Sequence, residues 1–461
     1  MSTAAASARL EAPSSYDWDT FFAALGDVPA TRDTVTVKRK SRDYFWYSPV
    51  LNEQLKAKFA EVVVSPRDEA EVIRAASACA KARIPLVVRG AGTGNYGQAV
   101  PLEGGVILDM AALDAIEWIK PGLVRVGAGR KMVAVDAETR RQGFELRMHP
   151  STKRLATIGG FVAGGSGGVG SVTYGGLREP GNIVAVRVVT VEEQPRVLEL
   201  RADAAQKVNR AYGTTGIITA LEMPLAPAWN WIDVIVAFDD YAEAFRFGHA
   251  VALADGVVKK LLTPITWPIP EKFTAIREHC PDGKSILIAM VAEPSMESFR
   301  MILAGHKGEI TFETPNEESP SQVPLYEYTW NHTTLQLLKT DRGITYLQSL
   351  FPADRLVESV LEMQALFGDE VLLHNEFIRF AGKLTASALQ IVRYTTPERL
   401  NEIIDIHERH GVMIANPHVY TLEDGSRHKR VDADQLGFKH EVDPYGLLNP
   451  GKMRSFVRAR A

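Results

Sequence analysis

The sequence predicts an α+β protein with more than one domain. A chain of 461 residues is too long for one ordinary domain. Nearly every glycine cluster falls before residue 228, among short strand-like segments, and the double proline of "PLAPAW" then marks a change. After it, strands such as "WIDVIVAF" and "SILIAMVAE" alternate with helical stretches such as "YAEAFRFGHAVALA" and "PERLNEIIDIHERHG". We therefore expect domains at 1–228 and 229–410, followed by a segment at 411–461.

The composition excludes several classes of protein. Hydrophobic residues make up 46% and charged residues 23%, as in globular proteins with sizeable cores. The formal net charge is −4 and no long basic run occurs, so nucleic acid is not an expected partner. No apolar stretch is long enough to span a membrane, and residues 1–15 read as a disordered lead-in rather than a signal peptide. Two cysteines fit a reducing compartment, so we expect a cytoplasmic protein.

The first domain begins with a strand–helix–strand unit. Residues 62–64 are a short apolar run suited to a buried strand. Ser65 is the expected N-cap of the next helix, with Pro66 at its first position and Asp68 three residues after the cap. The helix ends by Pro85, and "LVVR" forms the next strand. Short β-like segments then follow, "GGVILDM", "AIEWI" and "LVRVGAG", and later "NIVAVRVVTV".

The loop "RGAGTGNYGQ" at 89–98 contains the G-x-G-x-x-G pattern of dinucleotide-binding Rossmann folds. A Rossmann loop must run directly into a helix whose N-terminus faces the pyrophosphate. Here Pro101 and the pair Gly104–Gly105 forbid a useful helix, so the NAD hypothesis fails. Two interpretations remain for the loop, a flexible surface turn or a concave nest of backbone N–H groups that binds an anion.

A second glycine tract, "STKRLATIGGFVAGGSGGVGSVTYGG" at 151–176, favours a binding site. A flexible linker is the alternative, but linkers do not interleave apolar residues such as Ile158, Phe161 and Val169 among their glycines. The tract therefore reads as ordered backbone that approaches a large flat ligand closely. Two glycine loops on one β-rich domain suit a diphosphate joined to a planar ring, which describes FAD better than NAD.

These motifs resemble a known family. "RGAGTGN" at 89–95, "PST" with "ATIGG" and "GGVGSVTYG" in the second tract, "YGTTGIIT" at 212–219 and the terminal "NPGK" are similar to the vanillyl-alcohol oxidase/p-cresol methylhydroxylase flavoproteins. The similarity is greatest to the branch of glycolate oxidase FAD subunits and D-lactate dehydrogenases. It implies a two-lobed FAD-binding domain of the p-cresol methylhydroxylase type at 1–228, an α+β substrate (cap) domain at 229–410, and a return of 411–461 to the FAD domain.

The resemblance also implies which residues hold FAD. The first loop would wrap the pyrophosphate, the second tract would line the diphosphate and ribityl side, the "TGII" stretch would lie near the adenine half, and the "NPGK" asparagine would touch the flavin edge. The implied residues are Arg89, Gly90, Ala91, Gly92, Thr93, Gly94, Asn95, Pro150, Ser151, Thr152, Thr157, Gly159, Gly160, Gly165, Ser166, Gly168, Ser171, Gly216, Ile217, Ile218 and Asn449.

The chain departs from many relatives in two respects. A histidine in the first loop or a cysteine in the second tract commonly tethers FAD, but this chain has Thr93–Gly94 in the first loop and no cysteine near either tract. We therefore expect non-covalent FAD, with His149 as the one nearby histidine. The metal-assisted 2-hydroxy acid dehydrogenases carry a Glu-His-Gly motif where this chain reads "IANPHVYTLEDG", so we expect no metal, and the substrate stays open.

Oxidation of an alcohol by flavin needs a group that accepts the hydroxyl proton. Strand alternation in "LLHNEFIRF" puts His374 and Glu376 on one face and Arg379 on the other, and in "ANPHVYT" it puts His418 and Tyr420 on one face. These faces could simply meet solvent, or their histidines could be satisfied core residues. As a set we place them at the substrate, with His418, Tyr420 and His374 around it, Arg379 on any carboxylate, and Glu376 and His332 as further candidates.

The expected function is FAD-dependent oxidation of a small hydroxylated molecule, including 2-hydroxy acids. The electron acceptor could be oxygen, a quinone or a carrier protein. Two alternatives remain open: a non-catalytic FAD-binding subunit of a larger complex, and a flavin reductase fed by NADPH. A homodimer is a further expectation for the assembly.

Overall fold

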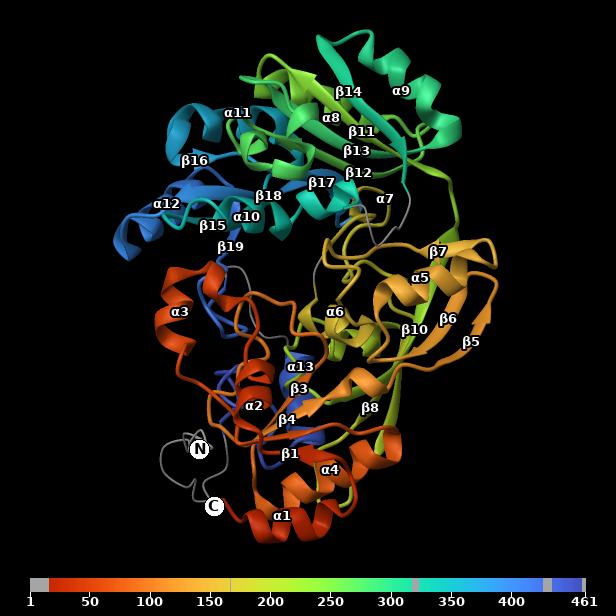
Figure 1. Cartoon of the computed structure of the whole chain (residues 1–461), viewed down its shortest axis with the longest axis vertical. Coiled ribbons are helices and arrows are strands. Elements are labelled where there is room, and N and C mark those ends of the chain that lie inside the picture. The colour runs from red at the N-terminus through yellow and green to blue at the C-terminus, as the bar shows by residue number, and fades with distance from the viewer. Residues whose placement is uncertain (1–15, 166, 317–322, 426–432, 458–461) are drawn as a thin grey trace, which may run out of the picture.

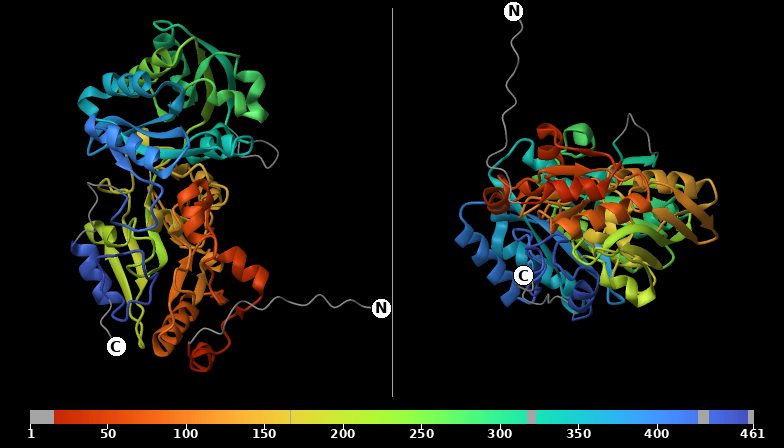
Figure 2. Two further views of the ribbon diagram at one scale, coloured as in Figure 1. Left: turned by 90° about the vertical axis from the view of Figure 1, so that its left-hand side faces the viewer. Right: turned by 90° about the horizontal axis from the view of Figure 1, so that it is seen from below.

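The computed structural model describes residues 16–165, 167–316, 323–425 and 433–457. Two bodies are visible in Figure 1, one below that contains both ends of the described chain and one above built from the middle of the chain. Figure 2 shows that the lower body consists of two lobes lying side by side beneath the upper one. The residues expected to form a disordered lead-in, 1–15, lie outside the described part. No helix in the described ranges is long and apolar enough to cross a membrane.

The first lobe is a small, mostly parallel sheet. Its order is β1 (Ala30–Thr31), β2 (Val62–Val64), β4 (Val106–Asp109), β3 (Leu86–Arg89), with β2, β4 and β3 parallel. All three residues of β2 are buried, as its apolar run predicts. Helices α1 (Trp18–Leu25) and α4 (Glu69–Ala82) pack against one another, and α2 (Thr34–Lys40) and α3 (Pro49–Leu55) complete the lobe.

The expected N-cap of helix α4 is wrong by three residues. The cap is Asp68, whose carboxylate accepts the N–H of Glu71 at 2.8 Å. Ser65 instead continues the extended chain after β2 and donates its backbone N–H to Pro29 O. A carboxylate beside the positive end of the helix dipole satisfies a free N–H group there, which favours the aspartate.

The second lobe is an antiparallel sheet of six strands. Its order is β5 (Ile116–Lys120), β6 (Leu123–Gly127), β10 (Ile217–Pro227), β8 (Ala185–Val189), β9 (Val197–Arg201), and β7 (Phe144–Leu146) pairs with the far end of β10. Helix α5 (Met132–Arg140) contacts β7. The second glycine tract lies in this lobe and forms the short helices α6 (Ile158–Gly164) and α7 (Ser171–Tyr174).

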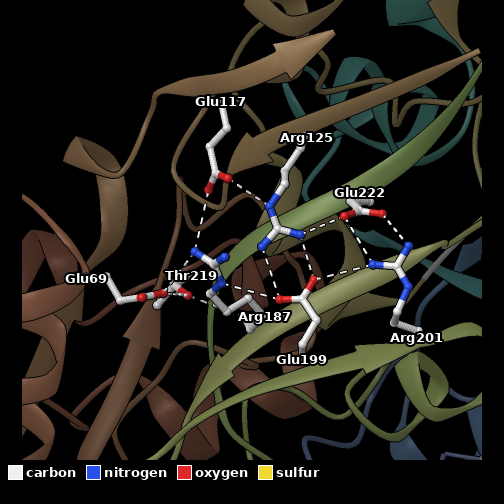
Figure 3. A network of polar contacts seen from close by, with 8 residues as sticks. All are labelled: Glu69, Glu117, Arg125, Arg187, Glu199, Arg201, Thr219 and Glu222. Carbon is white, nitrogen blue, oxygen red and sulfur yellow. Dashed lines mark hydrogen bonds and ion pairs between the residues drawn. The ribbon is translucent and has the colours of Figure 1, made fainter. Parts of the chain in front are cut away.

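A network of ion pairs covers part of this sheet and reaches helix α4 (Figure 3). At its centre, the Arg125 guanidinium is 2.8 Å from Glu117, 2.6 Å from Glu199 and 2.8 Å from Glu222. The other members are Arg187, Arg201, Thr219 and, on α4, Glu69. Because five strands of the second lobe and one helix of the first lobe contribute, the network helps to hold the two lobes together.

The upper body contains two antiparallel sheets. One has the order β12 (Lys259–Ile265), β13 (Ser285–Ala292), β11 (Trp231–Phe238), β14 (Gly308–Pro315). The other has the order β16 (Val371–Leu372), β18 (Lys383–Arg393), β15 (Ile344–Leu350), β19 (Met413–Ala415), with β17 (Asn375–Phe380) also paired to β18. A bridge between Ile265 and His374 connects the two sheets. The helices α8 (Tyr241–Leu253), α9 (Met296–Leu303), α10 (Asn331–Leu338), α11 (Leu356–Phe367) and α12 (Pro397–Arg409) cover them.

The last segment connects both bodies. Strand β19 belongs to the upper sheet, whereas helix α13 (Ala433–Val442) packs in the core of the second lobe through Phe438 and Val442. Leu448 then pairs with Leu86 of the first lobe. The exact domain boundaries stay a prediction, but the chain crosses between the bodies just before β11 and just after β19.

Two predicted strands are shorter than the sequence suggests. "EVLLHNEFIRF" is interrupted at Leu373 and His374, between β16 and β17. The strand predicted through "ANPHVYT" stops at Ala415, and the Asn416 side chain accepts the His418 N–H at 2.9 Å in a turn. Pro417 lacks the N–H that a continuing ladder needs, and asparagine favours such turns, so the strand ends there.

Candidate functional site

The two glycine tracts meet each other in space. The first loop follows β3 and is not followed by a helix, which confirms that it is not a Rossmann loop. A Cβ added to Gly90 would lie 2.1 Å from Thr157 Oγ1 of the second tract, so the two backbones approach as closely as glycine allows. Thr157 is the N-cap of α6 and accepts the Gly160 N–H at 3.3 Å. Two stretches far apart in sequence therefore form one surface.

Arg89 supports the first loop from behind. Its guanidinium donates to the carbonyl oxygens of Lys40 at 2.9 Å and Ala91 at 3.2 Å, and also to that of Arg42. A Cβ at Gly92, whose φ is +70°, would collide with this guanidinium at 2.1 Å. The arginine thus shapes the loop, and its side chain is not part of the cavity wall described next.

The C-terminal segment supports the same loop. Asn449 donates through Nδ2 to Gln98 O at 2.8 Å and to Tyr212 O at 2.6 Å, which joins the first loop to the "YGTTGIIT" stretch. Lys452 Nζ donates to Gly97 O at 2.6 Å and lies near the buried carboxyl of Asp43, whose pKa burial raises to about 6. Burial also lowers the pKa of Lys452, to about 7. The "NPGK" motif therefore holds the loop in place and does not line the cavity.

A cavity of about 860 Å³ lies between these tracts and the upper body. That volume is within the range of cofactor sites. Of the predicted FAD residues the following line it: Gly90, Ala91, Gly92, Thr93, Gly94, Asn95, Pro150, Ser151, Thr152, Thr157, Gly159, Gly160, Gly165, Ser171, Gly216 and Ile218. Arg89, Gly168, Ile217 and Asn449 do not line it, and Ser166 lies outside the described residues. Gly168 is used for packing instead, since a Cβ there would lie 2.2 Å from His149 O.

The wall fits a large polar ligand. Cβ atoms added at Gly164 and Gly176 would meet no protein atom within 4 Å, so the backbone there faces open space. Three residues that line the cavity carry a buried side-chain atom without a hydrogen-bond partner in the described chain: Asn95 (Nδ2), Trp330 (Nε1) and Asn331 (Oδ1). Bare backbone in one region and unsatisfied donors and acceptors in others match a ligand with phosphates and a ring edge, as FAD has.

The upper wall comes from segments that the sequence analysis largely missed. It consists of Trp330 and Asn331, part of β15 (Gln348, Ser349, Leu350), part of β17 (Ile378, Arg379, Phe380), Ser387 and Leu389 of β18, and Met413, Ile414 and Ala415. Arg178 and Arg210 add two cations from the lower body. Of the residues predicted around the substrate, Arg379 alone is on this wall. For Arg178 the sequence held a usable signal, because it lies two residues after the end of the second glycine tract.

His418 lies in a structural junction. It is 4% exposed, its Nε2 is 2.9 Å from the carbonyl oxygen of Tyr346, and its Nδ1 is 2.7 Å from Ser48 Oγ. Because a carbonyl oxygen can only accept, Nε2 carries the proton and Nδ1 accepts from the serine. Burial lowers the pKa of His418 to about 4, so the ring is neutral at neutral pH. It joins the two bodies and lies off the cavity wall; Tyr420, near Lys452, is also off that wall.

His374 and Glu376 are brought together but behind the wall. The His374 Nε2 lies 2.9 Å from Glu376 Oε1, and both side chains are buried. Glu376 also accepts the backbone N–H of Trp330 at 2.7 Å, and Trp330 lines the cavity. His332 is partly buried, and desolvation lowers its pKa to about 4, but it does not line the cavity. Direct contact of these residues with substrate stays a prediction. Their position off the cavity wall does not favour it.

No histidine or cysteine lines the cavity in the part of the chain that is described. Cys79 and Cys280 are buried in two other apolar cores. His149 is 1% exposed and lines a separate small cavity with Lys153 and Lys260. Within the described ranges there is also no group of three or more histidine, cysteine, aspartate or glutamate side chains that could hold a metal ion.

Comparisons with known proteins agree with this geometry. The family model described as an FAD binding domain matches residues 60–198. Glycolate oxidase subunit GlcD of Escherichia coli (strain K12) is 30% identical over 207 residues, which cover 43% of this chain and 41% of the relative. D-lactate dehydrogenase of Archaeoglobus fulgidus is 35% identical over 118 residues, covering 25% of this chain and 26% of the relative. The matched region thus spans less than half the length of these curated relatives.

A solved structure shares the whole fold. An alkyldihydroxyacetonephosphate synthase superposes with a TM-score of 0.71 at 15% identity, covering 96% of this chain and 87% of that one. At this identity the likeness shows the fold alone. Together with the family match, it confirms the expected fold class and cofactor. Residues 60–198 are therefore similar to an FAD binding domain, within a chain that has the fold of the synthase.

Proposed function

We propose that this protein is an FAD-dependent oxidoreductase that oxidises a small 2-hydroxy acid. The observation that carries the proposal is the single cavity that has glycine-rich backbone on one side and Arg379 on the other. Glycolate and D-lactate, which the names of two relatives contain, are both 2-hydroxy acids. The covered share of those relatives is small, so the substrate class rests on the cavity as well as on the likeness.

The glycine tracts are the proposed FAD site. Backbone N–H groups of residues 90–95 would face the diphosphate, and the α6 region would lie along the cofactor. The FAD held there would supply the acceptor for the hydride on the carbon that carries the hydroxyl group. We propose non-covalent binding, supported by the lack of histidine and cysteine among the described lining residues. Acid precipitation of the holoprotein should then leave the yellow chromophore in the supernatant; colour in the pellet would contradict it.

Arg379 is the proposed carboxylate-binding residue. It lies on β17 with its neighbours Ile378 and Phe380 also on the cavity wall. Its ion pair with Asp255 is long, 3.9 Å between Nη2 and Oδ1, and Asp255 is exposed, so little holds the guanidinium away from a ligand. A planar guanidinium suits bidentate binding of a carboxylate. Arg178, also on the wall, adds a second positive charge at the cavity.

A second candidate is a non-catalytic FAD-binding subunit. GlcD is named as a subunit of glycolate oxidase, which supports a role within a larger assembly. The two candidates differ in one respect, because a catalytic chain reduces its own flavin when substrate binds.

The test is anaerobic reduction of the bound flavin. FAD-loaded protein would be mixed with D-lactate or glycolate, and with propionate or acetate as the matched acids without a hydroxyl group. We expect bleaching of the flavin absorbance by at least one hydroxy acid and by neither control. Flavin that none of a panel of hydroxy acids bleaches would favour the non-catalytic subunit, and bleaching by NADPH would favour a flavin reductase.

A further inference from the structure

Trp330 and Asn331 occupy the junction between the upper body and the second glycine tract. Both residues line the cavity, and Asn331 is the first residue of α10. The indole ring lies against the tract, since a Cβ added to Gly167 would be 3.1 Å from its Cη2 atom. Trp330 also packs against a large apolar core cluster, most of which belongs to the upper body. Apolar packing therefore helps to fix this residue at the border of the cavity.

The backbone of Trp330 has an unusual conformation that a buried carboxylate supports. Its φ is +52°, a region that residues with side chains rarely adopt. Its N–H donates to Glu376 Oε1 at 2.7 Å, and Glu376 is 1% exposed. Glu376 is itself held by His374 Nε2 at 2.9 Å and by the hydroxyl of Thr263. Strained backbone held by a buried network is typical of residues that must be placed accurately.

Two polar atoms of this pair are buried and have no hydrogen-bond partner in the described chain, and the residues that carry them line the cavity. They are Trp330 Nε1, which can only donate, and Asn331 Oδ1, which can only accept. An unpaired buried donor or acceptor raises the free energy of the empty site. A ligand that hydrogen-bonds to both atoms removes this penalty and binds more tightly for that reason. A hydroxyl group is the small substituent that accepts one hydrogen bond and donates another.

We propose that Trp330 and Asn331 recognise the hydroxyl group of the substrate. The Trp330 Nε1–H donates to the hydroxyl oxygen, and Asn331 Oδ1 accepts the hydroxyl hydrogen. Glu376 is a positioning residue, which acts through the Trp330 backbone without touching the ligand. The inference rests on the proposed function and deepens it, because it assigns the group that separates a 2-hydroxy acid from the plain acid. A site with these paired groups rejects an analogue that lacks the hydroxyl group.

The test compares two ligands that cannot be oxidised. In 2-hydroxyisobutyrate the carbon bearing the hydroxyl group has no hydrogen to transfer, and isobutyrate lacks the hydroxyl group. Their Kd values for the FAD-loaded protein would be measured from the perturbation of the flavin absorbance. We expect the hydroxy acid to bind at least about tenfold more tightly to the wild type. In Trp330→Phe, which keeps the ring and removes the N–H, and in Asn331→Ala, this ratio should fall towards one.

Glu376→Gln tests the positioning role. It should lower the same ratio while leaving the Kd of isobutyrate nearly unchanged, which a general loss of structure would not do. Trp118→Phe is the matched control, because Trp118 lies on β5 away from the cavity and contacts Lys120. This control should keep the wild-type ratio, and each variant's Kd for FAD would be measured in parallel.

The outcomes separate the two proposals. If the wild type binds neither acid, the proposed function fails and the inference fails with it. If it binds both acids equally, or if Trp330→Phe keeps the wild-type ratio, only the inference fails. A loss of FAD affinity in Trp330→Phe with an unchanged ratio would assign the indole N–H to the cofactor instead and would also overturn the inference.

Discussion

The two walls of the cavity differ in what forms them, backbone in the lower wall and side chains in the upper wall. The lower wall consists of two glycine tracts whose backbones touch, as the clash of a Gly90 Cβ with Thr157 shows. The upper wall is assembled from side chains on β15, β17 and β18, from β19 and from the 330–331 pair. Two backbones can approach this closely only at glycine, so the lower wall is visible in the sequence as clusters of glycine. A wall of ordinary side chains has no comparable pattern in the sequence. The lower wall was therefore predictable, whereas Arg379 was the one predicted residue that lies on the upper wall.

The largest expected effect lies away from both walls, in the ion-pair network of Figure 3. Arg125→Met leaves Glu222 and Glu199 without their central partner, and Arg125 is only 5% exposed. We expect the free energy of unfolding to fall by about 3–5 kcal/mol, with an unchanged Kd for FAD. Urea unfolding and FAD titration would measure the two quantities.

Arg187→Met is the matched control for that substitution. Arg187 is partly exposed and its contacts with Glu69, Glu117 and Glu199 are 3.4–3.9 Å long. Its loss should cost less than about 1 kcal/mol. If the two variants are equally stable, Arg125 is not the energetic centre of the network as described.

The next largest effect is expected at the lower wall. Gly164 is the last residue of α6, and a Cβ there meets no protein atom, so Gly164→Leu should fold and project its side chain into the cavity. We expect the Kd for FAD to rise by about 100-fold or more, which is about 2.7 kcal/mol. Gly437→Leu, at an equally open glycine of helix α13 away from the cavity, is the control and should bind FAD as the wild type does. Equal FAD affinity in both variants would place the cofactor elsewhere.

A smaller effect is expected at the upper wall. Arg379→Gln removes the proposed charge on the carboxylate, and a hydrogen bond to a charged group contributes about 1.5–3 kcal/mol. The Kd of a 2-hydroxy acid, taken from the concentration dependence of flavin reduction, should therefore rise by at least about tenfold, with an unchanged Kd for FAD. Arg393→Gln, on β18 outside the cavity wall, should change neither value. An unchanged Kd for the acid in Arg379→Gln would remove the carboxylate assignment.

The last expected effect depends on pH and concerns His418, which joins the two bodies. Its pKa in the folded protein, about 4, lies below the usual value of 6.5, so the unfolded chain binds more protons between these pH values. The free energy of unfolding should fall as the pH drops from 6.5 to 4, by up to about 1.4 kcal/mol per pH unit for this group, and should not depend on it above 6.5. In His418→Gln this contribution is absent, so the pH dependence should be shallower. The same slope in both proteins would show that the ring is not held neutral by folding.

Prediction from sequence succeeded where the physical cause was local. The buried run of β2, the absence of a helix after the first glycine loop and the glycine content of each tract can all be read from short stretches of sequence. Prediction was less accurate where a second local group competed. Asp68 is the N-cap of α4 in place of the expected Ser65. Asn416 and Pro417 end the strand that was expected to carry His418. The contacts of His418 with Ser48 and Tyr346 join positions far apart in the chain, and no local pattern in the sequence could show them.

The glycine side of the cavity is the part on which every other assignment depends. The most direct test is a titration of the flavin-free chain with FAD, followed by flavin fluorescence. We expect saturation at one FAD per chain for the wild type and for Gly437→Leu, and much weaker binding for Gly164→Leu. A wild-type chain that binds no FAD, or one whose FAD binding Gly164→Leu leaves intact, would contradict the account.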